Sequence, residues 1–272
     1  MASNEVSAIS CQQSKLITLL LSSIILVHAL GLSRNVSFCS QAQFFVWKNT
    51  GSGLPDENTT NSQQEPAIEV IVKSIGNGKE GHAQTRGLEL KLDEFFGESD
   101  QSHHYFVESG AYDGITHSNT IWLERKRGWN GLLIEGNPNL AAEIRTSGRS
   151  KSKLLEGCLA TTNEVSKLEF LLAGPLGGIA SNIEKNHEER IKKEIDNNEP
   201  WMNEESVGPT VQVTCYPLNE VLRTMKQDVV DFWSLDTEGS EVDILETVDF
   251  RRYTFGLIFI VMASTLLIGG SC

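Results

Sequence analysis

Short apolar runs alternate with amphipathic helical segments through the second half of the chain, and this alternation constrains the fold more than any other feature. Four runs have the length and character of strands: residues 105–108, 131–135, 153–158 and 229–236. Runs this apolar are typical of parallel strands covered on both faces, and right-handed crossovers then produce a doubly wound sheet. The sequence therefore predicts an α/β, Rossmann-like domain whose ligand lies beyond the carboxyl ends of the strands.

Two further segments complete the predicted domain. An amphipathic helix at residues 88–96 places the beginning of the ordered domain near residue 85. An insertion at residues 168–214 separates the third and fourth strands, and its two ends are expected to pair as extended segments. Between them, a capping box at Ser181 opens a helix that is charged enough to be expected in solvent.

The first predicted strand ends in a loop of small residues at positions 108–114. Gly110 lets the backbone turn sharply, and small neighbours let a ligand approach the main chain. The loop lacks the spacing of a dinucleotide fingerprint, and no lysine follows it as in a phosphate loop. Taken alone, the loop is a moderate signal for a ligand site, and an ordinary strand-to-helix turn is the alternative. However, Glu135 ends the next strand, and a carboxylate at that place can accept both hydroxyls of a ribose. One ligand therefore explains both the loop and the acid.

Three carboxylates follow the fourth predicted strand: Asp236, Glu238 and Glu241. Such a group acts as a base, binds a metal or holds a polar substrate. The alternative is ordinary charge at a helix N-terminus, where acids are favoured and Ser240 is the expected cap. We favour a catalytic role for Asp236, leave both interpretations open for Glu238 and expect a structural role for Glu241. No metal site is predicted.

An uncharged apolar segment at residues 16–32 precedes the domain. It is just long enough to cross a hydrocarbon layer of about 30 Å. It is either a signal anchor, with residues 1–15 as a cytosolic tail, or a cleaved signal peptide. Both interpretations place the following residues in the secretory lumen or outside the cell. Residues 33–84 are poor in apolar side chains and are predicted to be a flexible lumenal stem.

The composition is compatible with this placement. Asn35 and Asn58 lie in N-glycosylation sequons. Four of the five cysteines follow the apolar segment, where disulfides are permitted, and the sequence does not choose among their three pairings. The formal charge of −13 repels a phosphate backbone, so we expect no nucleic-acid partner.

Residues 108–114, 128–138 and 234–241 together resemble the FkbM-type methyltransferase domain, and residues 112–120 resemble its animal, Star-like membrane branch. The resemblance implies class I methyltransferase architecture with S-adenosylmethionine as the cofactor. It implies that the loop lines the methionine and ribose side, that Glu135 holds the ribose diol and that two later residues lie near the adenine. The implied cofactor-binding residues are Glu108, Gly110, Ala111, Asp113, Gly114, Glu135, Cys158 and Leu159. Cys158 and Cys215 also match the pattern of the branch, which leads to the hypothesis that they form a disulfide.

Two functions follow from this resemblance. Bacterial members are O-methyltransferases, which implies methyl transfer to an unknown small hydroxyl acceptor, with Asp236 or Glu238 taking the proton. Star-like members are single-pass membrane proteins of the endoplasmic reticulum, Golgi and endosomes that are linked to trafficking of membrane cargo. They imply a membrane anchor and a non-catalytic adaptor that holds a membrane-protein cargo, because a fold does not fix a function.

The end of the chain departs from the family pattern. The methyltransferase domain is placed at residues 85–258, and an apolar tail at residues 259–272 stands where the family continues to closing antiparallel strands. The predicted sheet is therefore truncated, which exposes backbone donors at its edge. Residues 254–270 are a second membrane segment, a buried strand at 254–261 with a short tail, or the product of alternative splicing or a faulty gene model.

Overall fold

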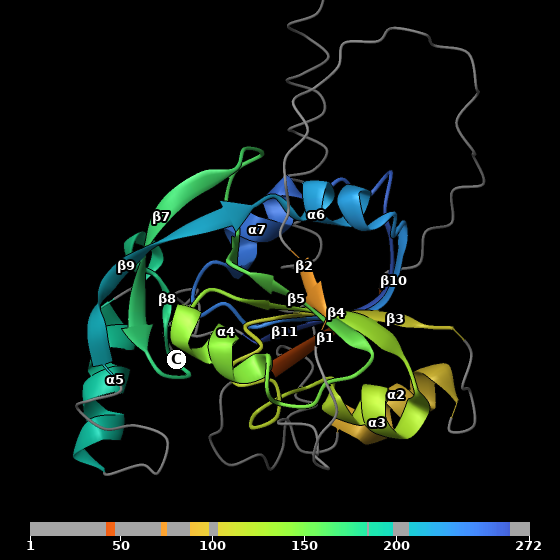
Figure 1. Cartoon of the computed structure of the whole chain (residues 1–272), viewed down its shortest axis with the longest axis horizontal. Helices are drawn as coiled ribbons and strands as arrows, with labels where there is room; N and C mark the ends of the chain where they lie inside the picture. The colour runs from red at the N-terminus through yellow and green to blue at the C-terminus, as the bar shows by residue number, and fades with distance from the viewer. Residues whose placement is uncertain are drawn as a thin grey trace, which may run out of the picture.

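The structure is a computed structural model that describes residues 42–46, 72–74, 88–97, 103–183, 185–197 and 207–261 (Figure 1). Its strands are β1 (Ala42–Val46), β2 (Val72–Ser74), β3 (Tyr105–Ser109), β4 (Asn130–Glu135), β5 (Ser152–Glu156), β6 (Cys158–Leu159), β7 (Ser166–Ala173), β8 (Gly178–Ile179), β9 (Val207–Tyr216), β10 (Val229–Leu235) and β11 (Thr254–Val261). Its helices are α2 (Leu88–Phe96), α3 (Ile121–Arg127), α4 (Pro138–Ile144), the 3-10 turn η1 (Ala180–Asn182), α5 (Lys185–Asp196), α6 (Leu218–Met225) and α7 (Glu241–Thr247).

The main sheet has a parallel centre. Within the described residues its order is β1-β11-β10-β3-β4-β5-β2, and the strands from β11 to β5 run parallel to one another. The strand order reverses beside β3, because β4 lies on one side of it and β10 on the other. The expected α/β architecture is therefore confirmed, and the carboxyl ends of β3, β4 and β10 meet at one edge.

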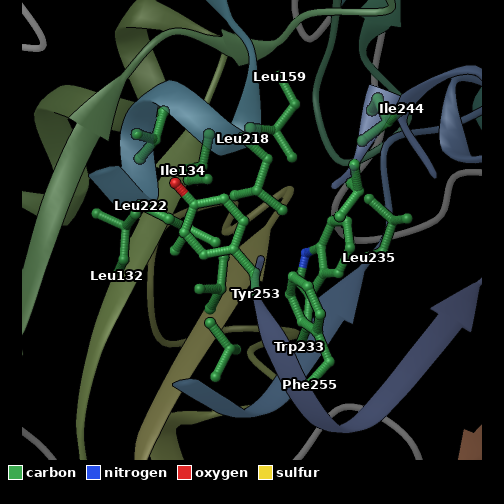
Figure 2. Packing of buried hydrophobic residues seen from close by; sticks show 14 of the residues in the cluster. Leu132, Ile134, Leu159, Leu218, Leu222, Trp233, Leu235, Ile244, Tyr253 and Phe255 are labelled. Carbon is green, nitrogen blue, oxygen red and sulfur yellow. The ribbon is translucent and has the colours of Figure 1, made fainter. Parts of the chain in front are cut away.

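Each face of this sheet carries its own hydrophobic core, because successive strand residues point to opposite sides. In β10, Trp233 packs with Leu218 of α6 and Ile244 of α7 (Figure 2). The preceding residue, Phe232, belongs to the opposite core together with Leu92 of α2. Helices thus cover both faces, as expected for a doubly wound sheet.

Both edges of the parallel centre are paired, which corrects the expectation of an exposed edge. β11 is a buried strand, so the second of the three interpretations of residues 254–270 describes residues 254–261 correctly. β1 runs antiparallel along it, with Ala42 opposite Val261 and Val46 opposite Leu257. β2 runs antiparallel along β5 at the other edge. Two segments far away in the sequence therefore satisfy the backbone groups that an open edge leaves unpaired.

The insertion forms a second, smaller sheet beside the first. Its order among the described residues is β6-β9-β7-β8, and β7 pairs antiparallel with β9, as the sequence predicts for the two ends of the insertion. The helix α5 follows at Lys185, later than the capping box at Ser181 implies. The expectation that α5 is solvated is wrong for one face, because His187 and Ile191 are only 3% and 6% exposed.

Several predicted segments lie outside the described residues. Residues 1–15 and 16–32 are among them, as are residues 262–272 and most of residues 33–84, so the tail, the anchor and the stem stay predictions. β1 and β2 are described strands within residues 33–84. None of the helices among the described residues combines the length and the apolar character that a membrane crossing requires.

Candidate functional site

The small-residue loop after β3 packs directly against the end of β10. Gly110 has a φ of 82°, and a Cβ atom there would lie 1.8 Å from the carbonyl oxygen of Asp236. The amide of Asp236 donates to the carbonyl oxygen of Ser109 at 3.0 Å, which holds the two strand ends in register. On the other side, the amides of Gly110 and Ala111 donate to the carbonyl oxygen of Ile134 in β4 at 3.0 and 3.1 Å. Only glycine fits position 110, because any side chain would collide with the Asp236 backbone. The backbone hydrogen bonds anchor the loop to both neighbouring strands.

Glu135 connects the end of β4 to this loop. Its Oε2 accepts a hydrogen bond from the amide of Tyr112 at 2.8 Å, and its Oε1 accepts one from the amide of Asn137 at 2.8 Å. Tyr112 has a φ of 53°, a backbone conformation that is uncommon for a residue with a side chain and that recurs at functional sites. Burial raises the pKa of Glu135 to about 7, partly offset by the backbone donors. The structure thus brings together the loop and the acid that the sequence associates with one ligand.

The other loop residues shape the turn itself. Asp113 accepts hydrogen bonds at its Oδ1 from the amides of Ile115 and Thr116, at 2.8 and 2.6 Å, which is an Asx-type turn. Gly114 has a φ of 77°, and its amide donates to the carbonyl oxygen of Ala111 at 2.8 Å. Contacts of Asp113 and Gly114 with a cofactor stay predictions.

Glu108 lies inside a buried polar network. Its carboxylate accepts hydrogen bonds from the amide of Asn119 at 2.6 Å, from the hydroxyl of Ser118 at 2.8 Å and from the hydroxyl of Thr120 at 2.5 Å. The Nη1 atom of Arg149 lies 3.7 Å from its Oε2. Glu108 therefore fixes the segment that leads into α3, and a cofactor contact for it stays a prediction.

Asp236 differs from its neighbours because one of its two carboxyl oxygens lacks a hydrogen-bond donor among the described residues. Its Oδ1 is inaccessible to solvent, and no described residue donates a hydrogen bond to it. Burial raises the pKa of Asp236 well above its usual range, and the charges of Glu238 and Glu241 raise it further. A buried carboxyl oxygen without a donor is costly, so this atom is a candidate contact for a ligand.

Glu238 is held by the insertion. Its Oε2 lies 3.3 Å from Nη1 of Arg190 and 3.5 Å from Nδ1 of His187, both on α5. The Nε2 atom of His187 lies 2.8 Å from the carbonyl oxygen of Leu176, which only accepts, so Nε2 carries a proton. Burial raises the pKa of Glu238, and Arg190 opposes this effect. The backbone of Glu238, with a φ of 55°, turns the loop toward α5.

Glu241 serves the loop as the sequence predicts. Its Oε1 accepts hydrogen bonds from the amide of Thr237 at 2.8 Å and from the amide of Gly239 at 3.2 Å. Ser240 occupies the N-cap position of α7, but its side chain makes no capping hydrogen bond. The expected serine cap is therefore wrong, and Glu241 satisfies the loop amides in its place.

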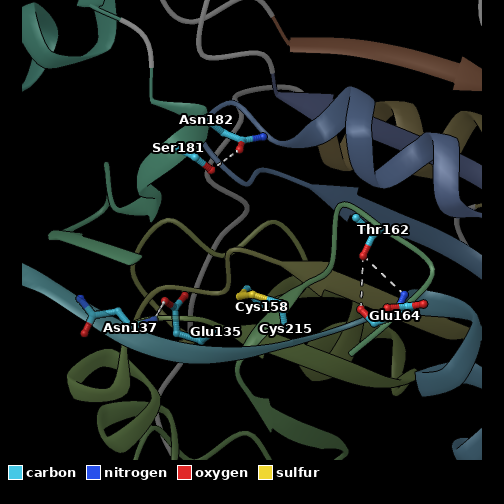
Figure 3. The surroundings of a disulfide bond; sticks show 8 residues. All are labelled: Glu135, Asn137, Cys158, Thr162, Glu164, Ser181, Asn182 and Cys215. Atoms are coloured by element: carbon cyan, nitrogen blue, oxygen red, sulfur yellow. Dashed lines mark hydrogen bonds between the residues drawn. A yellow bond between two sulfur atoms is a disulfide. The ribbon is translucent and has the colours of Figure 1, made fainter. Parts of the chain in front are cut away.

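The disulfide hypothesis is confirmed: Cys158 of β6 and Cys215 of β9 are bonded, and Figure 3 shows them near Glu135. The two residues are also direct partners in the strand pairing. Leu159 is 1% exposed and packs in the core shown in Figure 2. The predicted contacts of Cys158 and Leu159 with adenine stay predictions.

The described residues contain no group of three or more side chains arranged to hold a metal ion. Three residues that organise this edge were not predicted from the sequence: Arg149, His187 and Arg190. Arg149 follows α4 without a motif around it. The other two lie on a helix whose charge pattern is that of a solvated surface, so no local signal identified them.

The family model of the methyltransferase FkbM domain matches residues 108–265. This range begins at Glu108, includes the whole insertion and extends past β11. No curated protein and no solved structure matches the chain significantly.

Proposed function

We propose that this chain, which belongs to the methyltransferase FkbM domain family, binds S-adenosylmethionine at the carboxyl ends of β3, β4 and β10 and methylates a hydroxyl group of a small acceptor. The observation that carries the proposal is the contact between Glu135 and the amide of Tyr112. It joins the small-residue loop to the one acid at the end of β4, which is the arrangement that a nucleoside requires.

The residues present fit this cofactor. The carboxylate of Glu135 accepts hydrogen bonds from the amides of Tyr112 and Asn137, and the amide of Gly136 also acts on it. A carboxylate has about four lone-pair sites, so accepting capacity remains for ribose hydroxyls. Across the small-residue loop, Asp236 offers a buried carboxyl oxygen to which no described residue donates. When bound, S-adenosylmethionine supplies a methyl group that is already activated on a sulfonium sulfur.

The chain's own contribution to methyl transfer is then positioning and proton removal. The small-residue loop and the loop that holds Asp236 touch through their backbones at Gly110 and Asp236, which fixes the position of one relative to the other. Asp236, in its ionised form, takes the proton of the acceptor hydroxyl, with Glu238 as the neighbouring carboxylate. Because Glu238 already lies against Arg190 and His187, Asp236 is the better placed base.

We further propose that the domain lies in the lumen of the endoplasmic reticulum, Golgi or endosomes, attached by a single membrane segment at residues 16–32. Support comes from the apolar sequence of that segment and from the bond between Cys158 and Cys215. Disulfides of this kind persist in oxidising compartments and are rare in the cytosol.

The disulfide also favours a second candidate function. A lumenal domain is separated from the cytosol, where S-adenosylmethionine is usually made and used. A non-catalytic, Star-like adaptor that holds membrane-protein cargo during trafficking is compatible with that location. The two functions differ in one measurable property, which is binding of the cofactor.

The test is isothermal titration of the purified chain with S-adenosylmethionine. We expect binding, and we expect Glu135→Ala to weaken it by about 30-fold or more, because two hydrogen bonds to a charged acceptor are lost. Glu156→Ala is the matched control: Glu156 stands opposite Glu135 on β5 but pairs with Arg145. Absence of binding at millimolar cofactor, in a chain shown to be folded by circular dichroism, would remove the enzyme and leave the adaptor.

A further inference from the structure

The three carboxylates after β10 are not equivalent. Glu241 accepts the amides of its own loop, and Glu238 lies against Arg190 and His187. Asp236 alone has a buried oxygen to which no described residue donates. This oxygen is therefore the one in the group that gains most from a partner supplied by a ligand.

The position of Asp236 specifies which part of the cofactor it meets. The strand order places β4 on one side of β3 and β10 on the other, with the small-residue loop between them. Glu135 is on the β4 side, and the backbone of Asp236 touches Gly110 on the β10 side. A nucleoside that held its ribose at Glu135 and extended its 5′ substituent across the loop would bring that substituent, which in this cofactor carries the sulfonium, toward Asp236.

Burial and most of the charges around Asp236 oppose its ionisation. The groups that act on it are the carboxylates Glu238, Glu241 and Glu108 and the guanidinium of Arg190. Arg190 already lies close to Glu238 and Glu194. Burial and the surrounding negative charge raise the pKa of Asp236 well above its usual range, which favours the protonated carboxyl group over the carboxylate.

We propose that Asp236 senses the charge on the cofactor sulfur: it is protonated in the free protein, releases its proton to solvent when the sulfonium binds, and thereby favours S-adenosylmethionine over the uncharged product S-adenosylhomocysteine. The proposal rests on the proposed function, because it requires that the chain binds this cofactor. The proton balance is simple: one proton leaves Asp236 for the buffer, and the carboxylate that remains faces the positive sulfur.

Two consequences follow for the reaction. The carboxylate becomes available as a base only when a methyl donor is bound, so the base and the donor appear together. After transfer, Asp236 would keep the proton that it took from the acceptor hydroxyl, and a neutral sulfur would offer it no charged partner, so the hold on the product would be weaker. Preference for the charged cofactor must therefore increase with pH, since a proton that is released on binding opposes binding at low pH.

The experiment measures binding and proton release without any acceptor. Full-length chain is titrated with S-adenosylmethionine and, separately, with S-adenosylhomocysteine, at pH values from about 6 to about 8, in phosphate and in Tris. We expect the binding heat of S-adenosylmethionine to differ between the two buffers by the ionisation heat of up to about one proton. The product should show no such difference. The affinity ratio of the two ligands should rise by up to about tenfold per pH unit.

Two variants complete the test. Asp236→Asn should abolish proton release and the pH dependence of the ratio, while leaving the affinity for S-adenosylhomocysteine nearly unchanged. Asp228→Asn is the matched control, since Asp228 is an exposed aspartate just before the opposite end of β10. If both ligands bind with a ratio that does not change with pH, the charge sensor is wrong and the cofactor site stands. If neither ligand binds, the proposed function fails and the sensor fails with it.

Discussion

Replacing Arg149 by methionine tests whether a buried ionic network holds the small-residue loop in place. Arg149 is 0% exposed, and its guanidinium donates to five acceptors. Nε donates to Glu124 at 2.7 Å, Nη1 donates to the carbonyl oxygen of Gly114 and to Ser118, and Nη2 donates to Thr120 and Ser152. Since Gly114 belongs to the small-residue loop, the network joins that loop to α3 and to β5.

The expected loss can be worked out from these contacts. Methionine keeps most of the side-chain volume, so the cavity term is small. The charge, however, is removed from between Glu124 and Glu108, which are both buried. Breaking a buried pair by removing one partner costs roughly 3–5 kcal/mol, because the remaining charge is left without compensation. We expect Arg149→Met to lower the free energy of unfolding by that amount at neutral pH, and by less in acid, where the carboxylates are protonated.

Urea denaturation followed by circular dichroism measures this loss. Arg145→Met is the matched control, because Arg145 forms an exposed pair with Glu156, and exposed pairs contribute little to stability. The double variant Arg149→Met, Glu124→Gln should lose clearly less free energy of unfolding than the sum of the two single changes. The reason is that one buried charge is removed together with its partner. A loss below about 1 kcal/mol for Arg149→Met, or strict additivity of the two changes, would refute the reasoning.

Two further predictions concern stability. Burial raises the pKa of Glu135 from 4.5 to about 7. Between these pH values the folded state binds more protons than the unfolded state. The free energy of unfolding should therefore fall as pH rises through that window, by at most about 3 kcal/mol from this group. Urea midpoints at several pH values check this, and a midpoint that rises throughout the window would contradict it. Reduction of the bond between Cys158 and Cys215, which are separated by 57 residues, should lower the free energy of unfolding by about 4 kcal/mol. Non-reducing mass spectrometry that finds both cysteines as free thiols would show that the bond does not form.

The parts of the fold that the sequence predicts well are those that depend on local patterns. The apolar runs at β3, β4 and β10 lie within a residue or two of their predicted bounds. Asn137 caps α4 through a hydrogen bond from the amide of Asn139 at 3.0 Å, and Gly128 ends α3 in the left-handed conformation. A cap and a strand depend on neighbours in the chain, so a short window of sequence contains the necessary information.

The parts that the sequence does not predict depend on contacts between distant segments. An edge strand such as β1 pairs through backbone groups, which every residue except proline provides, so its pairing leaves little pattern in the sequence. The buried face of α5 is equally hidden. His187 is polar and nonetheless 3% exposed, because the carbonyl oxygen of Leu176 and the carboxylate of Glu238 lie around it.

The same limit explains why the candidate site was predicted only in outline. Glu108, Glu135 and Asp236 each lie at or next to the end of a strand at the same edge, and the sequence does not say which of them the protein itself supplies with donors. What distinguishes them is the supply of hydrogen-bond donors. Glu108 receives donors from the segment before α3, and Glu135 receives backbone amides and keeps accepting capacity. Asp236 has an oxygen to which no described residue donates. A carboxylate that is fully satisfied by its own protein stabilises the fold, whereas one that is not is available to a ligand. Glu135 and Asp236 both meet that criterion, and they lie on the two sides of the small-residue loop. They are therefore the pair through which a charged nucleoside would be recognised.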